Sequence, residues 1–176
     1  MITEAYSEKF RRLAASFDCG NPYLNHFLQS RDSLDPGIAK TFVVLSDDES
    51  EIIGYYSLDC GAVDQITGSY HEKIGGAIHI RCFALGREHK HQIEQVAPDG
   101  TRLYLSDIIF SDCLARIESI RAHSVGAEFV TLASTPEGER LYRRHGFEDL
   151  EDDLSFSPTH GEDQCVCLYL PLDYEI

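Results

Sequence analysis

The sequence is poor in basic residues and has no long apolar run. Its 176 residues include 30 acidic and 15 basic side chains, for a formal net charge of −15. This balance makes a nucleic-acid partner unfavourable, because the phosphates would be repelled over most of the surface. No apolar stretch approaches the ~20 residues that cross a membrane. Residues 1–10 lack the apolar core of a signal peptide. We therefore expect a cytoplasmic protein with no membrane partner.

Metal-binding motifs are also lacking. No C-x-x-C pair occurs among the six cysteines. Cys165 and Cys167 lie in a segment that alternates like a strand, which places both thiols on one face. A metal site and two buried thiols are both compatible with this pair, and buried thiols are the commoner arrangement. His89 and His91 have no third ligand nearby, which favours solvated histidines. We expect no bound metal.

Composition indicates an ordinary folded chain. Hydrophobic residues make up 43% of the sequence and charged residues 26%, which is typical of a globular protein. A chain of this length buries a sizeable core. It contains no internal repeat, low-complexity tract or linker. These features predict one domain over residues 1–176.

Hydrophobic patterning predicts strands and helices in mixed order. Strands are expected over residues 41–47, 52–63, 77–85, 127–134 and 165–172. The first two would form a hairpin. A short amphipathic helix is expected over 22–30, with Asn21 as its N-cap and Pro22 at its first position. Residues 86–100 are polar and have no clear period, so they are predicted to form a long loop.

The strongest helical pattern covers residues 105–123. One mostly apolar stripe of this helix is traced by Ile109, Cys113, Arg116, Ile117 and Ile120. A second, shorter helix should begin with Thr135 as the N-cap and Pro136 at the first position, and Gly146 should end it. An antiparallel hairpin followed by a strand–helix–strand unit predicts a mixed α/β (α+β) fold.

Several short motifs, taken together, resemble one family. RLYRRHGF at 140–147 is similar to the L-Y-x-x-x-G-F ending of the GNAT superfamily of acetyl-CoA-dependent N-acetyltransferases. TPEGERLY matches that family's N-x-x-A-x-x-L-Y, with Thr135 in place of Asn and Gly138 in place of Ala. CFAL at 82–85 resembles the strand before the cofactor loop. FDCGNPYLNHFL, TFVVL and IIGYYSL resemble the toxin-type branch, which includes enzymes that modify aminoacyl-tRNA. The resemblance covers nearly the whole chain.

The resemblance implies a splayed, mostly antiparallel mixed sheet with helices on both faces. It also implies acetyl-CoA as co-substrate and direct attack by a primary amine on the thioester, with no covalent enzyme intermediate. Backbone N–H groups of Phe83, Ala84 and Leu85 would polarise the thioester carbonyl. Tyr142 matches the family tyrosine that protonates the departing thiolate. Thr135 would lie on the cofactor side.

The expected cofactor loop departs from the family pattern R/Q-x-x-G-x-G/A. Counting back from Gly126, the loop falls on Arg102, Leu103, Tyr104, Leu105, Ser106 and Asp107. Leucine hinders close backbone approach, and aspartate places a negative charge against pyrophosphate. Residues 86–100 also lengthen the connection before it. Replacement contacts to the phosphates would come from Arg87, Lys90, Arg102, Arg140, Arg143 or Arg144.

Three functions are compatible with this sequence. The first is an N-acetyltransferase acting on a small-molecule or protein amine, and the acidic surface favours a cationic acceptor. The second is a binding or regulatory module that has lost catalysis. The third is a toxin-type enzyme acting on aminoacyl-tRNA, which the net charge disfavours.

The sequence does not select the residue that accepts the proton of the substrate amine, and it does not fix the assembly state. Asp59 and Glu72 are equal candidates for accepting the proton of the substrate amine. His79 lies in a strand, where a hydrogen-bonded structural histidine is favoured over a base. A homodimer is compatible with the sequence.

Overall fold

The computed structural model describes residues 1–157 and 165–172. Its strands are β1 (Ile2–Ala5), β2 (Lys40–Leu45), β3 (Ile52–Thr67), β4 (Tyr70–Leu85), β5 (Ile93–Val96), β6 (Arg102–Tyr104), β7 (Phe129–Ser134), β8 (Glu148–Asp149), β9 (Leu154–Ser157) and β10 (Val166–Pro171). Its helices are α1 (Arg11–Ala14), α2 (Pro22–Gln29), α3 (Leu105–His123) and α4 (Glu139–Arg144), with 3-10 turns η1 (Glu8–Phe10), η2 (Asp32–Leu34) and η3 (Arg87–His89).

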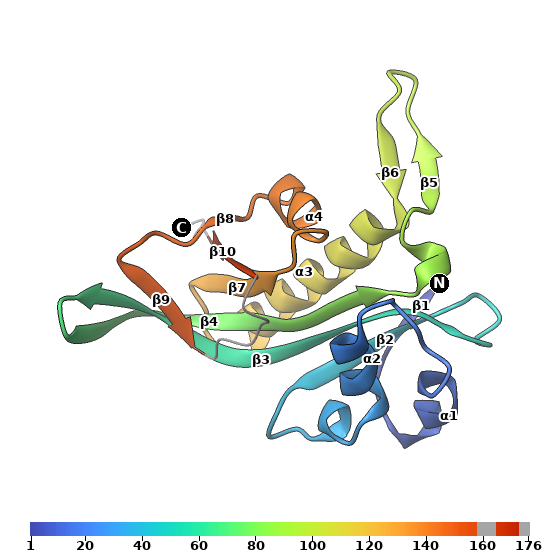
Figure 1. The fold of residues 1–176 in the computed structure, drawn as a ribbon, viewed down its shortest axis with the longest axis horizontal. Coiled ribbons are helices and arrows are strands. Elements are labelled where there is room, and N and C mark those ends of the chain that lie inside the picture. The colour runs from blue at the N-terminus through green and yellow to red at the C-terminus, as the bar shows by residue number, and fades with distance from the viewer. Residues whose placement is uncertain (158–164, 173–176) are drawn as a thin grey trace. The chain divides into compact units, whose positions relative to one another are not determined.

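One mixed sheet contains most of the strands. Its hydrogen-bonding order is β1-β2-β3-β4-β7-β10-β8, and β9 pairs with β3 (Figure 1). β4 and β7 are parallel, whereas β1–β2, β2–β3, β7–β10, β8–β10 and β3–β9 are antiparallel. The parallel pair is joined through α3, which is the crossover that such a pair requires. The predicted mixed α/β fold class is confirmed.

The contacts divide the chain into two compact units. The first consists of Met1–Leu58 and Cys82–Arg116, and the second of Asp59–Arg81 and Ile117–Ile176. β3, β4 and α3 contribute residues to both units.

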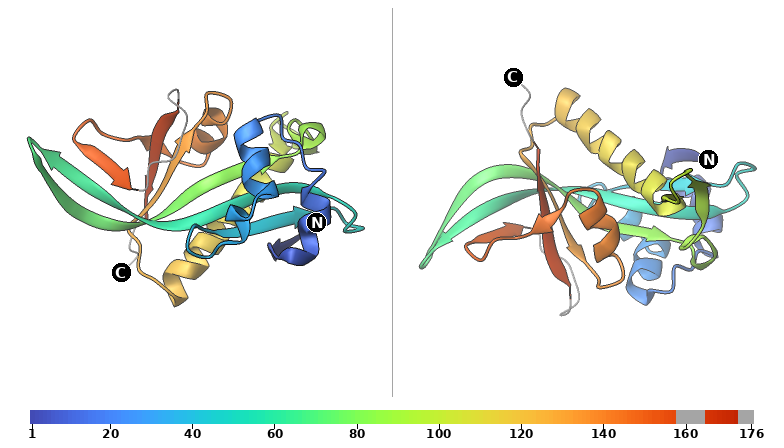
Figure 2. Two further views of the ribbon diagram at one scale, coloured as in Figure 1. Left: turned by 60° about the horizontal axis from the view of Figure 1, so that its bottom comes forward. Right: turned by 90° about the horizontal axis from the view of Figure 1, so that it is seen from above.

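Helices cover both faces of the strands in the first unit (Figure 2). Tyr55 points toward the N-terminal helices, where its ring lies edge-on to Phe17 at 5.5 Å and its hydroxyl donates to the Leu24 carbonyl at 2.7 Å. Tyr56 points to the other face and donates to Asp112 Oδ2 of α3 at 2.7 Å. Alternation along β3 therefore decides which helix each tyrosine contacts.

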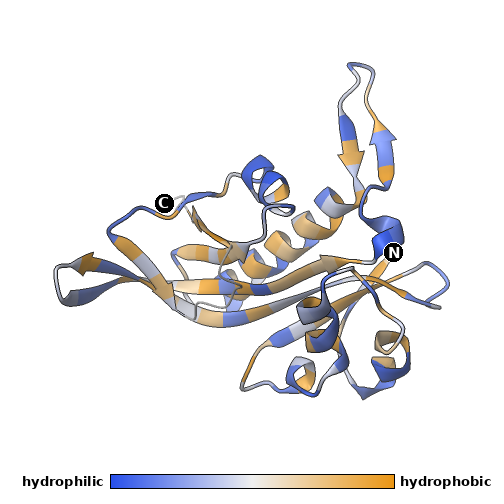
Figure 3. Ribbon diagram, viewed as in Figure 1, coloured by the Kyte–Doolittle hydropathy of each residue, from blue (hydrophilic) through white to orange (hydrophobic). Residues whose placement is uncertain are grey.

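The second unit has a smaller core. Val63 of β3, Ala77 of β4 and Phe156 of β9 are buried together. Phe129 and Leu154 pack against them. Figure 3 shows the alternation of apolar and polar residues along these strands. The small core follows from the short strands around it, because β7, β9 and β10 each span six residues or fewer.

The predicted helices and strands of the first unit are largely confirmed. α3 spans the predicted residues 105–123. α2 begins at Pro22, and the Asn21 side chain accepts from the N–H groups of Tyr23 at 2.9 Å and Leu24 at 3.3 Å. The predicted hairpin forms from β2 and β3. β4 begins earlier than predicted, at Tyr70.

The predicted long loop over 86–100 is wrong. After η3, residues 93–104 form a two-stranded ribbon of β5 and β6, which projects from the first unit in Figure 1. The turn at its tip uses Gly100 at φ 87°, a conformation that favours glycine. All of β5 is exposed, so burial imposes no alternation that the sequence would reveal.

The start of α4 also differs from the prediction. The helix begins at Glu139, so Thr135 is not its N-cap. The Thr135 carbonyl instead accepts from the N–H groups of Gly138 at 3.0 Å and Glu139 at 3.2 Å, which forms a turn before the helix. Gly146, at φ 86°, follows the end of the helix as predicted. Within the described residues, no helix has the length and hydrophobicity needed to span a membrane.

The attachment of α3 to β3 gives a test of stability. The Tyr56 hydroxyl is shared, since it donates to Asp112 and accepts from Arg116 Nε at 2.7 Å. The Arg116 guanidinium also lies 4.2 Å from the centre of the Phe42 ring. We predict that Tyr56→Phe lowers the free energy of unfolding by about 1–3 kcal/mol, because two charged groups lose a hydrogen-bond partner. Urea denaturation measures the change.

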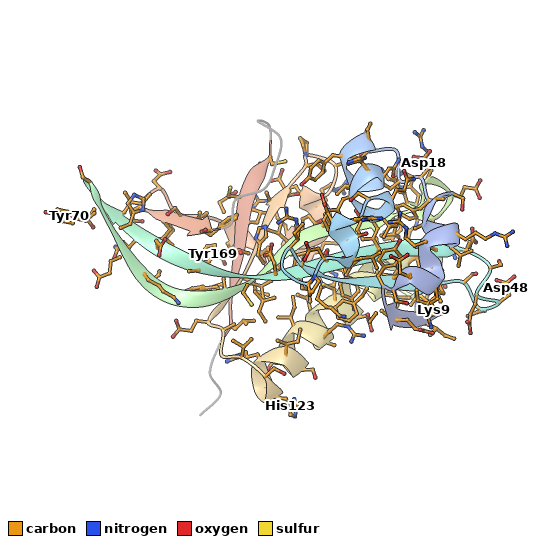
Figure 4. The ribbon with its side chains drawn as sticks, turned by 90° about the horizontal axis from the view of Figure 1, so that it is seen from below. Lys9, Asp18, Asp48, Tyr70, His123 and Tyr169 are labelled. Carbon is orange, nitrogen blue, oxygen red and sulfur yellow. The ribbon has the colours of Figure 1, made fainter. Side chains whose placement is uncertain are left out.

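Tyr70→Phe is the matched control. Tyr70 is 80% exposed at the tip of the β3–β4 hairpin, where Figure 4 labels it. Its hydroxyl therefore contributes little to stability, and the control should unfold like the wild type. An equal effect of the two substitutions would contradict the assigned role of Tyr56.

Candidate active site

The parallel ladder between β4 and β7 ends early. Its register runs from Ala77↔Phe129 to Ile80↔Leu132. β4 nevertheless continues to Leu85, and β7 continues to Ser134, where it still pairs with β10 through Val166. Two neighbouring strands that stop pairing leave backbone polar groups outside the ladder. The end of this ladder is therefore the starting point for the candidate site.

The predicted site residues fall into both units. The first unit contains Phe83, Ala84, Leu85 and all of residues 102–107. The second contains Thr135 and Tyr142. The structure therefore groups the carbonyl-polarising and cofactor-loop candidates in one unit, and the tyrosine in the other.

The end of β4 is tightly packed within the first unit. Ala84 and Leu85 are buried, and the ring of Phe83 lies edge-on to that of Phe110 in α3, with centroids 5.2 Å apart. Gly54 of β3 has no room for a side chain, because an added Cβ would lie 3.0 Å from the Ala84 carbonyl oxygen. The backbone of residues 83–85 is thus held in a defined position.

Residues 102–107, the predicted cofactor loop, run from strand β6 into the start of helix α3. Arg102, Leu103 and Tyr104 form β6, and Leu105, Ser106 and Asp107 form the first turn of α3. Leu103 is 39% exposed, whereas Leu105 is buried. The assignment of these six residues to the cofactor stays a prediction.

The beginning of α3 is already capped. Asp107 Oδ2 accepts from the Tyr104 N–H at 3.1 Å, and the Leu105 N–H donates to the Gln92 carbonyl at 2.9 Å. A carboxylate at the third helical position that binds the N–H before the helix is half of a capping box. It also interacts favourably with the positive end of the helix dipole. The glycine-rich pyrophosphate cradle of the family is therefore not present at these residues.

Arg87 and Arg143, two of the predicted phosphate-binding cations, have carboxylate partners among the described residues. Arg87 Nε lies 2.8 Å from Asp18 Oδ2, and Arg143 lies 2.7 Å from both Glu139 and Asp149. Hydrogen bonds from Asn25 and the Gly20 N–H, with the nearby Arg87, lower the pKa of Asp18.

The other four cations differ in exposure. Arg102, Arg140 and Arg144 are exposed, and Lys90 is half-buried. In the same region His89, expected to be solvated, is largely covered, with its side chain 19% exposed and Nδ1 3.0 Å from Gln92 Oε1.

Tyr142 is buried in the second unit on α4. Its ring centroid lies 6.1 Å from that of Phe147. Gly138, one turn earlier, leaves space for the ring, because an added Cβ would lie 3.0 Å from Tyr142 Cε2 and 3.4 Å from Ser134 Oγ. Tyr142 therefore sits beside the end of β7. The sequence signal for this packing was Gly138 at a position where the family has Ala.

His79 and Thr131 form a buried pair at the β4–β7 ladder. They are register partners, and His79 Nδ1 lies 3.0 Å from Thr131 Oγ1. The His79 ring is fully buried and contacts Phe156 at a centroid distance of 5.3 Å. These contacts agree with the expected structural histidine.

Asp59 and Arg81 form a second polar pair in the same unit. Arg81 Nη1 lies 3.2 Å from Asp59 Oδ2, and the side chains are 16% and 10% exposed. Burial raises the pKa of Asp59 to about 6, although Arg81 acts in the opposite direction. Glu72, the other candidate proton acceptor, is exposed. Sequence analysis missed Arg81, and the signal was a charged residue within the apolar segment 77–85.

The strand order and the shortened parallel ladder define a GNAT fold. Three solved structures match it over 97% of this chain. AtaTR bound with AcCoA has a TM-score of 0.68 at 18% identity and 92% coverage of that chain. AtaT complexed with acetyl-methionyl-tRNAfMet has a TM-score of 0.67 at 18% identity, with 94% of that chain covered. The KacTA–DNA complex has a TM-score of 0.66 at 18% identity, with 92% of that chain covered. No protein-family model and no curated protein sequence matches the chain. The likeness establishes the fold.

The packing of Gly138 against Tyr142 gives one prediction. Gly138→Ala should lower the free energy of unfolding by about 1–3 kcal/mol, because the new methyl group displaces the ring. The loss should disappear when Tyr142 is already Leu, which a double-mutant cycle measures. Gly126→Ala is the control, since an added Cβ there meets nothing within 4 Å. Additive effects of the two substitutions would contradict the contact.

The capped start of α3 gives a prediction about cofactor binding. Asp107→Asn keeps an oxygen for the Tyr104 N–H and removes the negative charge. If the diphosphate of acetyl-CoA binds at this helix end, its Kd should fall about fivefold, which corresponds to ~1 kcal/mol of charge interaction. Calorimetric titration measures the Kd. Asp99→Asn, in the exposed turn of the ribbon, is the control. An unchanged Kd would place the diphosphate elsewhere.

Proposed function

We propose that this protein is an acetyl-CoA-dependent N-acetyltransferase of the toxin type that acts on the α-amino group of an aminoacyl-tRNA. The observation that carries the proposal is the likeness over 97% of the chain to AtaT complexed with acetyl-methionyl-tRNAfMet. The likeness to AtaTR bound with AcCoA supports the acyl donor.

The proposed reaction is a direct transfer. The amine nitrogen attacks the thioester carbonyl carbon, the C–N bond forms, and the C–S bond breaks to release the coenzyme A thiolate. Backbone N–H groups at Phe83, Ala84 and Leu85 stabilise the negative charge that develops on the carbonyl oxygen. The Tyr142 hydroxyl donates its proton to the thiolate, and the buried position of the ring strengthens that interaction. The new amide nitrogen releases its extra proton to solvent, from which the tyrosinate is protonated again.

The diphosphate is held differently from the glycine-rich pattern in this proposal. The Ser106 N–H precedes the first hydrogen bond within α3 and points to the helix start. Arg102, three residues before the first residue of the helix, is exposed and has no ion-pair partner among residues 1–157 and 165–172. Together they provide a donor and a positive charge near a helix N-terminus.

A small-molecule or protein amine is the second candidate acceptor. The net charge of −15 favours it, because an acidic surface attracts cations and repels phosphates. A tRNA acceptor requires a local basic surface, for which exposed Arg140 and Arg144 of α4 are the candidates. The reaction at the amine is the same for both acceptors.

A module without catalysis is the third candidate. The Asp107 carboxylate at the start of α3 favours it, because a carboxylate there competes with a phosphate for the same N–H groups. A purified protein that fails to bind acetyl-CoA in a calorimetric titration would support this alternative and exclude the enzyme.

The test is acetyl transfer from labelled acetyl-CoA to methionyl-tRNA and, separately, to methioninamide. We expect transfer to methionyl-tRNA with the higher kcat/KM. Preference for methioninamide would select the small-amine acceptor instead. No transfer to either, or to a panel of primary amines, would overturn the proposal.

Tyr142→Phe tests the general acid. Its kcat should fall about 100-fold or more, because loss of a positioned acid costs 10²–10⁴-fold. The Kd for acetyl-CoA, measured by calorimetry, should stay within about twofold, since the ring is retained. Tyr70→Phe, at the exposed hairpin tip, should leave both values unchanged. A fully active Tyr142→Phe would remove Tyr142 from the mechanism.

A further inference from the structure

The Asp59 carboxylate uses its two oxygens differently. Oδ2 accepts from Arg81 Nη1 at 3.2 Å. Oδ1 is buried and has no hydrogen-bond partner within residues 1–157 and 165–172. A buried carboxylate oxygen without a donor is unfavourable by a few kcal/mol and is rare in folded proteins. The arrangement is understandable if a donor from outside the chain binds there.

The position of this pair agrees with that explanation. Arg81 immediately follows Ile80, the last β4 residue in the register with β7. Leu132 is the last β7 residue in this register, and β7 continues for two more residues to Ser134. Ser134 contacts the Gly138–Tyr142 packing described above. The carboxylate and the tyrosine therefore both belong to the second unit and to the same end of the parallel ladder.

We propose that Asp59 is the catalytic base that receives the acceptor amine: Oδ1 binds the ammonium group and removes one proton before the amine attacks the thioester. The inference rests on the proposed function and assigns the proton acceptor that this function requires. The step converts an ammonium and a carboxylate into a neutral amine and a carboxylic acid. Asp59 later returns the proton to solvent.

Arg81 is a positioning residue in this step. Its guanidinium fixes Oδ2 and so aims Oδ1 away from the ion pair. It also keeps the carboxylate ionised in a site where burial favours the neutral form. His79, two residues earlier on β4, is hydrogen-bonded through Nδ1 to Thr131 Oγ1. Among the described residues, Arg81 is the charged group that contacts Asp59.

The proton affinity of Asp59 suits the step. Its pKa of about 6 lies closer to that of an α-amino group, near 8, than the usual value near 4 does. Proton transfer is then unfavourable by about 100-fold, compared with about 10,000-fold for an unperturbed aspartate. Only the ionised carboxylate accepts a proton, so activity should rise with pH through about 6.

Glu72 is a less suitable base and provides the control. It is exposed in the outer part of β4, two residues from Tyr70 at the hairpin tip in Figure 4. Solvent screens an exposed carboxylate, so it binds an ammonium weakly. The structure separates two candidates that the sequence left equal.

The experiment measures kcat/KM against pH for transfer from acetyl-CoA to methioninamide. The wild type and Glu72→Gln should show a rising limb centred near pH 6. Asp59→Asn should lose that limb and fall about 100-fold or more in kcat/KM. Its Kd for acetyl-CoA should stay within about twofold of the wild-type value, since the carboxylate acts on the amine. Asp59→Glu, which keeps a carboxylate, should recover part of the activity and the limb.

The outcomes separate the two proposals. A wild-type protein that transfers no acetyl group overturns the proposed function and this inference together. An Asp59→Asn variant with the wild-type pH profile overturns only the assignment of Asp59.

A second measurement does not depend on activity or on the folding of a variant. The titration of the Asp59 carboxyl carbon is followed by NMR in the wild type, with and without methioninamide. A bound ammonium should lower the pKa of Asp59. The same titration curve in both samples overturns the inference.

Discussion

The early end of the β4–β7 ladder is the constraint on which the other features of this structure depend. Parallel pairing stops at Ile80↔Leu132, while β7 stays paired with β10 to Ser134. A sheet interior normally satisfies every backbone polar group, whereas a ladder that stops while its strands continue leaves N–H and C=O groups outside it. Arg81 follows the last pair directly, and Tyr142 packs beside the end of β7.

The start of α3 shows how one helix terminus can serve either stability or ligand binding. A helix N-terminus attracts negative charge, whether from a side chain or from a phosphate. Here the Asp107 carboxylate occupies that position and the Gln92 carbonyl takes the Leu105 N–H. Gln92 directly precedes β5, so the residues around the ribbon contribute to the cap. The residues that depart from the family pattern thus form a capped helix start.

Buried polar groups in the second unit fall into two kinds. His79 Nδ1 lies 3.0 Å from Thr131 Oγ1 within the core, and the His79 ring lies against Phe156. Asp59 and Arg81 leave one carboxylate oxygen without a partner in the described part of the chain. Burying a charged group is unfavourable unless it is paired and hydrogen-bonded. The second pair is where we propose that the substrate amine binds.

Sequence by itself determined the features whose signals are local. The bounds of α3 follow from a long apolar stripe, the start of α2 from Asn21 and Pro22, and the end of α4 from Gly146. Periodicity and capping act within a few residues, so they are visible in one segment of chain. The GNAT fold was predictable because several such motifs occur in a fixed order.

Tertiary structure decided the features that depend on distant partners. The β5–β6 ribbon has no buried face and therefore no sequence period, and α4 starts late because Thr135 forms a turn first. The choice between Asp59 and Glu72 required knowing which side chain is buried beside Arg81. That contact joins residues 22 positions apart through the alignment of β3 and β4. Register between strands is set by the packing of the whole sheet, so no local pattern contains it.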